Sequence, residues 1–135
     1  MKAGDALANA GQHVEALRSF SAAWNALADP KDEQDWAVNV LAAIADCCFF
    51  LARWEECCDA IQHAFHCGAS MSNPFLRLRL GQSLYELGNL RESANWLVPV
   101  YLTEGRKPFE GDDPKYLESV RGQLKPPPGG WPEGW

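Results

Sequence analysis

Three stretches of the chain repeat one pattern of small and large apolar positions. They begin at Gly4, Ala45 and Gly81, and in each an apolar residue follows three positions later. A small residue then stands at a turn and another follows it within the next helix. The large apolar position that comes next is filled, in chain order, by Phe20, Ile61 and Leu97. Small residues let two helices approach closely while large ones fill the grooves beside them, so the pattern predicts three helical hairpins.

The same pattern predicts seven helices. They are expected near residues 3–10, 12–28, 32–51, 54–67, 74–87, 89–104 and 114–123. Asn73-Pro74 combines a capping residue with a proline in the first turn, which is typical of a helix start, and Asp112-Asp113-Pro114 repeats this signal before the last helix. The first two repeats are further apart than the second and third, and the additional residues, around 29–34, predict a longer connection.

Residues 1–124 are expected to form a single all-α domain. Its last helix would cover the exposed apolar face of the third hairpin, as the ends of repeat arrays require. Residues 125–135 are rich in proline and glycine and cannot be helical, so they are predicted to form an extended tail. Trp131 and Trp135 in this tail either dock on the domain, which we favour, or serve as anchors for a partner.

Composition is that of a soluble globular protein of one domain. The chain has 135 residues, of which 47% are hydrophobic and 22% charged. The longest mostly apolar stretch, 38–52, is interrupted by Asn39 and Asp46, so it is too short and too polar to span a membrane. The first residues lack the long apolar block of a secretory signal, and a cytoplasmic protein is expected.

The five cysteines are expected to be reduced residues of the core. They are Cys47, Cys48, Cys57, Cys58 and Cys67. An odd number without a secretory signal is typical of reduced thiols. Four of them are adjacent pairs in helical sequence, where neighbours point about 100° apart and cannot both reach one ion. Even with His63 and His66 nearby, no metal site and no cofactor are predicted.

The residues that could carry chemistry are better explained by structure. The sequence lacks a nucleophile elbow, a phosphate-binding loop and a zinc-protease helix motif. His13 lies near a helical turn where packing is the favoured role. Glu55 and Glu56 form a first-turn acidic pair that complements the helix dipole. The chain is therefore not expected to be an enzyme or to take a small-molecule substrate.

The charge balance excludes one class of partner. The net charge is −6, whereas a nucleic-acid binder needs a basic face. The acidity would suit a basic protein partner, or it serves solubility alone.

The repeat resembles the tetratricopeptide family, whose unit of about 34 residues carries small and large apolar residues in this order. Leu80-Gly81 with Leu84, followed by Gly88-Asn89-Leu90, is the clearest example, and Ala16 with Phe20 is the next. The resemblance covers roughly residues 3–104, and it departs from the family in lacking the tryptophan that opens the pattern. It implies a right-handed α-solenoid of three hairpins and a capping helix.

In tetratricopeptide proteins the first helix of each hairpin lines a concave groove that binds another protein. Carried over by alignment, the resemblance places on that groove Asn39, Asp46, Phe49, Phe75, Leu78, Arg79, Gln82, Tyr85, Lys115 and Tyr116. Phe49 and Tyr85 could equally pack between helices. Asp5 and Asp46 stand where family members that grip a chaperone's terminal carboxylate have asparagine, so that clamp is not expected.

The C-terminal half carries a narrower resemblance, in NPFLRLRLGQSLYELGN, EGDDPKYLESV and PPPGGW. These segments resemble short bacterial tetratricopeptide proteins encoded beside polymorphic secreted toxins. The resemblance implies an immunity protein that binds its cognate toxin one-to-one and occludes it. A chaperone of the type III secretion kind, binding an extended segment, is the main alternative. A general adaptor is a third reading, and an enzyme or metal protein built on the Cys/His residues is a fourth.

Overall fold

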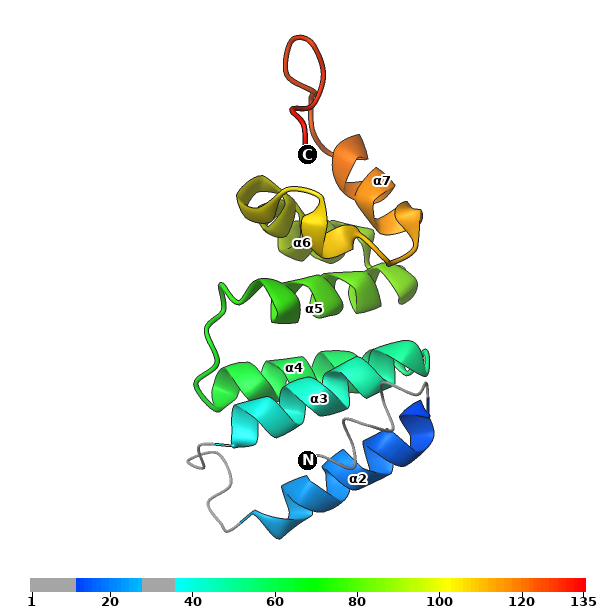
Figure 1. Ribbon diagram of the computed structural model, residues 1–135, viewed down its shortest axis with the longest axis vertical. Helices are drawn as coiled ribbons and strands as arrows, with labels where there is room; N and C mark the ends of the chain where they lie inside the picture. The colour runs from blue at the N-terminus through cyan, green and yellow to red at the C-terminus, as the bar shows by residue number, and fades with distance from the viewer. Residues whose placement is uncertain (1–11, 28–35) are drawn as a thin grey trace. The chain divides into compact units, whose positions relative to one another are not determined.

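The structure, a computed structural model, describes residues 12–27 and 36–135. This part of the chain is helical and contains no β-strand, which confirms the all-α class. Figure 1 shows the helices in chain order. They are α2 (His13–Ala26), α3 (Ala37–Phe50), α4 (Trp54–His66), α5 (Pro74–Glu86), α6 (Leu90–Glu104), the short 3-10 helix η2 (Lys107–Phe109) and α7 (Pro114–Gly122).

The predicted helix positions agree with the observed ones over the described residues. Helix α3 begins at Ala37, after a turn at Trp36, and residues 32–35 of the helix predicted from residue 32 lie outside the described residues. Residues 3–10, predicted as the first helix, and the whole of the long connection at 29–34 lie outside the described residues. None of the described helices is long and apolar enough to cross a membrane.

The chain divides into two compact units between Met71 and Ser72, and each is described by itself. The single domain expected over residues 1–124 stays a prediction. In the first unit α3 packs against both α2 and α4. The small residues that the repeat placed at helix contacts are buried there: Ala16, Ala45 and Cys57 are each 0% exposed. Four of the five cysteines are buried core residues as expected, and Cys67 is half-buried.

The second unit is built on the hairpin of α5 and α6. Gly81 lies where the two helices meet, because a Cβ atom at this position would be 2.6 Å from Cγ of Leu97. The hydroxyl of Ser93 on α6 donates a hydrogen bond to the Gly81 carbonyl over 2.7 Å. Gly81 and Ser93 are two positions at which the repeat has small residues, and both allow α5 and α6 to approach each other closely. Segment η2 and helix α7 then pack on α6.

The turns of the two hairpins that the structure describes, α3–α4 and α5–α6, use a left-handed backbone conformation. Gly88 between α5 and α6 has φ +85°, and Ala52 between α3 and α4 has φ +58°. In both turns a main-chain N–H reaches back to a carbonyl of the preceding helix, from Asn89 to Leu84 and from Arg53 to Cys48. These bonds satisfy carbonyl groups at the helix end.

The tail folds back instead of extending. Gly130 N–H donates to the Pro127 carbonyl, and Trp135 N–H donates to the Pro132 carbonyl. Gly129 and Gly134, the third residues of these two turns, have φ of +86°. A positive φ at the third position is typical of a type II turn, which glycine favours there. The prediction of an extended tail is wrong from residue 127 onward for this reason.

Two asparagines at helix starts allow a matched test of local stability. The Asn73 side chain accepts a hydrogen bond of 3.1 Å from the Leu76 N–H at the start of α5, whereas the Asn89 side chain makes no capping bond at the start of α6. We expect Asn73→Ala to lower the free energy of unfolding by about 1 kcal/mol. Asn89→Ala, the control, should lower it much less in the same urea titration. Equal losses would contradict the capping role of Asn73.

Candidate functional site

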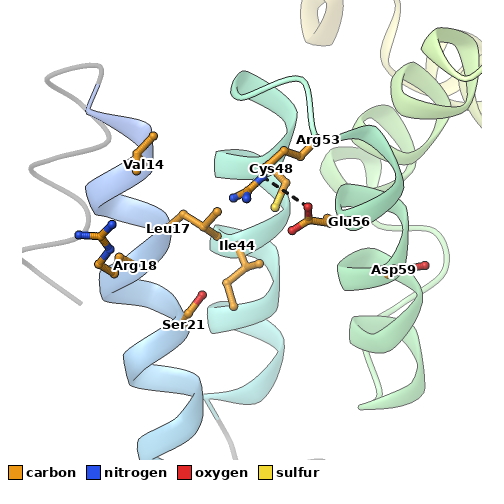
Figure 2. A pocket seen from close by; sticks show the side chains of 9 residues that line it. All are labelled: Val14, Leu17, Arg18, Ser21, Ile44, Cys48, Arg53, Glu56 and Asp59. Atoms are coloured by element: carbon orange, nitrogen blue, oxygen red, sulfur yellow. Dashed lines mark ion pairs between the residues drawn. The ribbon is translucent and has the colours of Figure 1, made fainter.

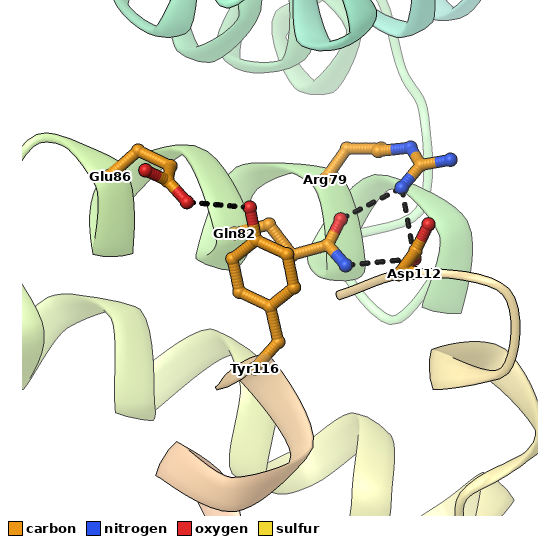
Figure 3. A network of polar contacts seen from close by, with 5 residues as sticks. All are labelled: Arg79, Gln82, Glu86, Asp112 and Tyr116. Carbon is orange, nitrogen blue, oxygen red and sulfur yellow. Dashed lines mark hydrogen bonds and ion pairs between the residues drawn. The ribbon is translucent and has the colours of Figure 1, made fainter. Parts of the chain in front are cut away.

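One face of α5 carries a polar network that the groove prediction placed in contact with a partner. Arg79 and Gln82 are three residues apart and therefore share a helix face. Arg79 Nη1 donates to Gln82 Oε1 over 2.9 Å. The same nitrogen lies 3.2 Å from Asp112 Oδ2, and Gln82 Nε2 donates to that oxygen over 2.9 Å. Figure 3 shows the three side chains converging, with Asp112 reaching α5 from the loop before α7.

This network is internal to the second unit. Gln82 is 0% exposed and Arg79 is 8% exposed. The Arg79 guanidinium also lies over the Phe75 ring, 5.6 Å from its centroid. Nη1 of Arg79 and the side-chain amide of Gln82 are thus hydrogen-bonded within the chain.

A second cluster lies further along α5, where α7 approaches it. The Tyr116 hydroxyl donates to Glu86 Oε1 over 2.8 Å, and the Lys115 ammonium pairs with the same oxygen. Tyr85 meets the Tyr116 ring edge-on, with centroids 5.5 Å apart. The Lys115 ammonium lies 5.8 Å from the centroid of Tyr85 and 5.3 Å from that of Tyr116. We call Tyr85, Glu86, Lys115 and Tyr116 the tyrosine–lysine cluster.

Lys115 and Tyr116, which both bond to Glu86, are held in their protonated forms at neutral pH. Burial, followed by the hydrogen bond to Glu86, raises the pKa of Tyr116, so its phenol stays a proton donor. The hydrogen bond to Glu86 raises the pKa of Lys115, which keeps the ammonium charged. Tyr116 is only 3% exposed, whereas the Lys115 side chain is 39% exposed. Lys115 is therefore the member of the cluster that a partner can reach most easily.

The structure brings together residues of α5 and α7 that were predicted to line the groove. Several of the predicted groove residues, in these helices and in α3, are buried. Leu78 and Phe49 are buried, at 5% and 7% exposure, while Phe75 is 39% exposed. The three remaining positions are Asn39, which is exposed, and Asp46 and Tyr85, which are half-buried. Asn39, Asp46 and Phe49 belong to α3 in the first unit.

Phe49 packs against aromatic side chains of its own unit. Its ring meets Phe50 and Trp54 edge-on, with centroids 5.4 Å and 5.5 Å apart. His13 stacks on Phe50 at 4.8 Å with the rings 13° from parallel, which confirms the packing role expected for His13. His63 meets Trp24 edge-on at 5.1 Å.

Asp112 and Glu86 are the residues of this face that the sequence did not assign. Asp112 belongs to a helix-start signal, but Asp113 is the residue that caps α7, by accepting a hydrogen bond from the Lys115 N–H over 3.0 Å. The signal that could have identified Asp112 is its position beside a second aspartate. Only Asp113 is needed to cap α7, so the carboxylate of Asp112 can bond to another side chain. Glu86 shares the face of Gln82 at helical spacing, and this was the corresponding signal on α5.

The first unit contains a cavity that none of the predicted residues lines. It has a volume of about 530 Å³ and lies among α2, α3 and α4. Figure 2 shows the nine side chains around it: Val14, Leu17, Arg18, Ser21, Ile44, Cys48, Arg53, Glu56 and Asp59. Arg53 and Glu56 form an ion pair of 3.3 Å at its edge. The pair is half-exposed, so it contributes little to stability.

Cys48 is the one cysteine among the residues that line this cavity, and its environment suppresses its reactivity. It is 1% exposed, and burial raises the pKa of its thiol to about 11. Because the thiolate is the reactive form, Cys48 is a poor nucleophile at neutral pH. Within the described residues, no group of three or more His, Cys, Asp or Glu side chains is arranged to hold a metal ion.

The chain matches no protein-family model, and no curated protein is significantly similar to it. A function for this chain therefore has to be inferred from its own residues and their geometry.

Proposed function

We propose that this chain is a tetratricopeptide-like protein-binding module, a right-handed array of three hairpins with α7 as its cap. We further propose that it acts as an immunity protein, binding a cognate secreted toxin and occluding its active site. The observation that carries the module proposal is the hairpin contact at Gly81, where a glycine meets the buried Leu97 side chain and Ser93 bonds the glycine carbonyl. This is the use that the family pattern makes of its small residues.

The tyrosine–lysine cluster supports a protein partner. Tyrosine is enriched where proteins bind each other, and Tyr85 is the half-buried tyrosine of this cluster. Lys115 adds a partly exposed cation, and Phe75 adds an aromatic side chain that is 39% exposed on the same helix as Tyr85. A surface of this composition suits a folded partner protein that brings acidic and apolar side chains against these residues.

The buried network favours the immunity role over the chaperone alternative. A chaperone of the type considered would receive an extended segment along the groove face of α5. Arg79 and Gln82 are two polar residues that were predicted to lie on that face. They are instead bonded to each other and to Asp112 of the same chain. Their hydrogen bonds are not available to an incoming segment unless Asp112 leaves. A partner that binds as a folded body on the partly exposed residues requires no such change.

The net charge of −6 adds a general preference for a basic partner, through long-range attraction. A cytoplasmic location, a protein partner bound one-to-one, and the absence of any role for nucleic acid, membrane, cofactor or catalysis are parts of the same proposal.

Growth rescue tests the proposed role. The full chain is co-expressed with the toxin domain encoded by its neighbouring gene, and growth is compared with expression of that domain alone. Restored growth is expected. Unchanged toxicity, with both proteins present in soluble form, would contradict the immunity role. Binding of an unfolded N-terminal segment of the neighbouring protein, without binding of its folded domain, would show the chaperone role instead.

Tyr85 is the cluster residue whose truncation should affect partner binding most. Tyr85→Ala removes a half-buried ring and is expected to weaken the complex by about 2 kcal/mol, roughly thirtyfold in Kd. Leu102→Ala, which removes an exposed apolar side chain of α6, is the control and should leave Kd unchanged. Calorimetric titration with the toxin domain measures both. Equal affinities for both variants, with unchanged Tm, would place the interface elsewhere on the chain.

A further inference from the structure

The folded-back tail occupies a site on α6 and α7. The centre of this site is Tyr101 on α6, which is 0% exposed. Trp131 and Trp135 both meet its ring edge-on, with centroids 5.3 Å and 5.8 Å away. Phe109 of η2 meets the same ring edge-on at 6.3 Å. Two indoles of the tail are thus held by one buried aromatic residue, which confirms that the tryptophans dock on the chain.

Polar groups hold the backbone of the tail at the same place. The Tyr101 hydroxyl donates to the Trp135 oxygen over 2.6 Å, and Arg121 Nη2 of α7 donates to that oxygen as well. The Arg106 N–H donates to the Gly134 carbonyl over 3.1 Å. Three donors from separate elements therefore meet the oxygens of two successive tail residues. The Arg121 guanidinium also lies over the Tyr101 ring, 5.9 Å from its centroid.

The backbone of the tail lies very close to the backbone at the end of α6. Gly105, at the end of α6, has φ +71°, and a Cβ atom there would lie 2.7 Å from the Gly134 carbonyl oxygen. Any side chain at Gly105 would therefore displace the tail. The turn at residues 132–135 presents the Trp135 ring and the Gly134 carbonyl together, since Trp135 N–H bonds back to Pro132.

The connection between α7 and the docked residues is separate from this site. Residues 125–130 are all exposed. No heavy atom lies within 4 Å of a Cβ built at Gly129 or Gly130. The segment that carries Trp131 and Trp135 is thus joined to α7 by an exposed linker and can leave the site as one piece.

We infer that Tyr101, Gly105, Arg106 and Arg121 form a peptide-binding site, with the chain's own tail as its ligand in cis. Its ligand class is a turn-forming Trp-Pro-x-Gly-Trp segment that brings an oxygen acceptor to Arg121. When the tail leaves, the site binds the same kind of segment from another molecule. An arginine beside a tyrosine hydroxyl prefers a charged acceptor, so a peptide ending in a carboxylate binds more tightly than its amide. This inference does not depend on the identity of the toxin.

The test uses the full chain, labelled with ¹⁵N, and the peptide Gly-Gly-Trp-Pro-Glu-Gly-Trp as free acid and as amide. Gly134→Ala weakens docking in cis, because alanine disfavours the φ of +86° that Gly134 adopts, and its Cβ would contact nothing within 4 Å. In this variant the amide signals of Gly105 and Arg106 should shift saturably with added peptide. In the unaltered chain they should not respond, because a tethered tail competes at an effective concentration of about 1 mM or more.

Three further peptide titrations complete the test of the binding site. The free acid should bind about tenfold more tightly than the amide, and Arg121→Gln in the Gly134→Ala background should remove that difference. A peptide with both tryptophans replaced by leucine should give no shift. The variant Trp131→Ser/Trp135→Ser, which empties the site by removing both ring contacts, should respond to the peptide as Gly134→Ala does. If neither tail variant responds to millimolar peptide while its other amide signals match the unaltered chain, the inference is overturned.

Discussion

Gly81→Ala is expected to lower the free energy of unfolding by about 2 kcal/mol, although alanine is the better helix former. The added methyl group would lie 2.6 Å from Cγ and Cδ2 of Leu97 and 3.2 Å from Cβ of Trp96. Leu97 is 0% exposed, so its side chain has no solvent to move into. Overpacking a buried contact costs about 1–3 kcal/mol, more than the gain of about 0.5–1 kcal/mol from replacing glycine in a helix.

Gly122→Ala is the matched control, because Gly122 is also helical and a Cβ atom there would meet nothing within 4 Å. The same substitution should leave stability unchanged or raise it by a few tenths of a kcal/mol at this helix end, by about the propensity difference. Urea titrations followed by circular dichroism measure both variants. A Gly81→Ala variant as stable as Gly122→Ala would contradict the close hairpin contact on which the module proposal rests.

Asp112→Ala is expected to lower the free energy of unfolding by about 3 kcal/mol, the largest effect anticipated for a single substitution here. The substitution removes a carboxylate that lies 3.2 Å from Arg79 Nη1 and accepts a hydrogen bond from the fully buried Gln82. The Arg79 side chain is 10% exposed and that of Asp112 is 14% exposed. A guanidinium in such a place keeps its desolvation penalty when the carboxylate is lost, which is why removing one partner is so unfavourable.

Glu110→Ala is the control for charge alone. Glu110 lies 3.6 Å from Arg106, but the side chains of this pair are 62% and 50% exposed, so its loss should change stability by less than about 1 kcal/mol. The triple variant Arg79→Met/Gln82→Met/Asp112→Leu should recover most of the stability lost in Asp112→Ala, since it removes both buried charges together with the buried amide that bonds to them. If Asp112→Ala and Glu110→Ala have the same urea midpoint, the network does not stabilise the α5 face as described.

Local patterns predicted the elements of this chain well. The spacing of small and large apolar residues placed the helices, and Asn73-Pro74 and Asp113-Pro114 placed the starts of α5 and α7. Such signals depend on residues within one or two helical turns of each other, so they can be recognised in the sequence without knowledge of the tertiary structure. Gly81 is the best case, because the spacing of its neighbours is enough to identify it as a contact position.

The predicted site was less complete because its contacts join residues far apart in the chain. Arg79 and Gln82 on a helix face look like groove residues until Asp112, about thirty positions later, is brought against them. The tail shows the same limit. Its proline and glycine content predicted an extended segment, whereas its folded-back path depends on Tyr101, Gly105 and Arg121 converging in space around Trp131 and Trp135. Packing of that kind has no signature in a local window.

The central proposal is that this chain is a module that binds one folded protein partner, and the mass of the complex tests it most directly. The purified chain is mixed with the purified, folded domain of the proposed toxin partner, and sedimentation velocity is recorded at micromolar concentration. The proposal predicts a single species with the summed mass of one copy of each protein, which Tyr85→Ala weakens and Leu102→Ala leaves unchanged. Two independently sedimenting proteins would contradict it.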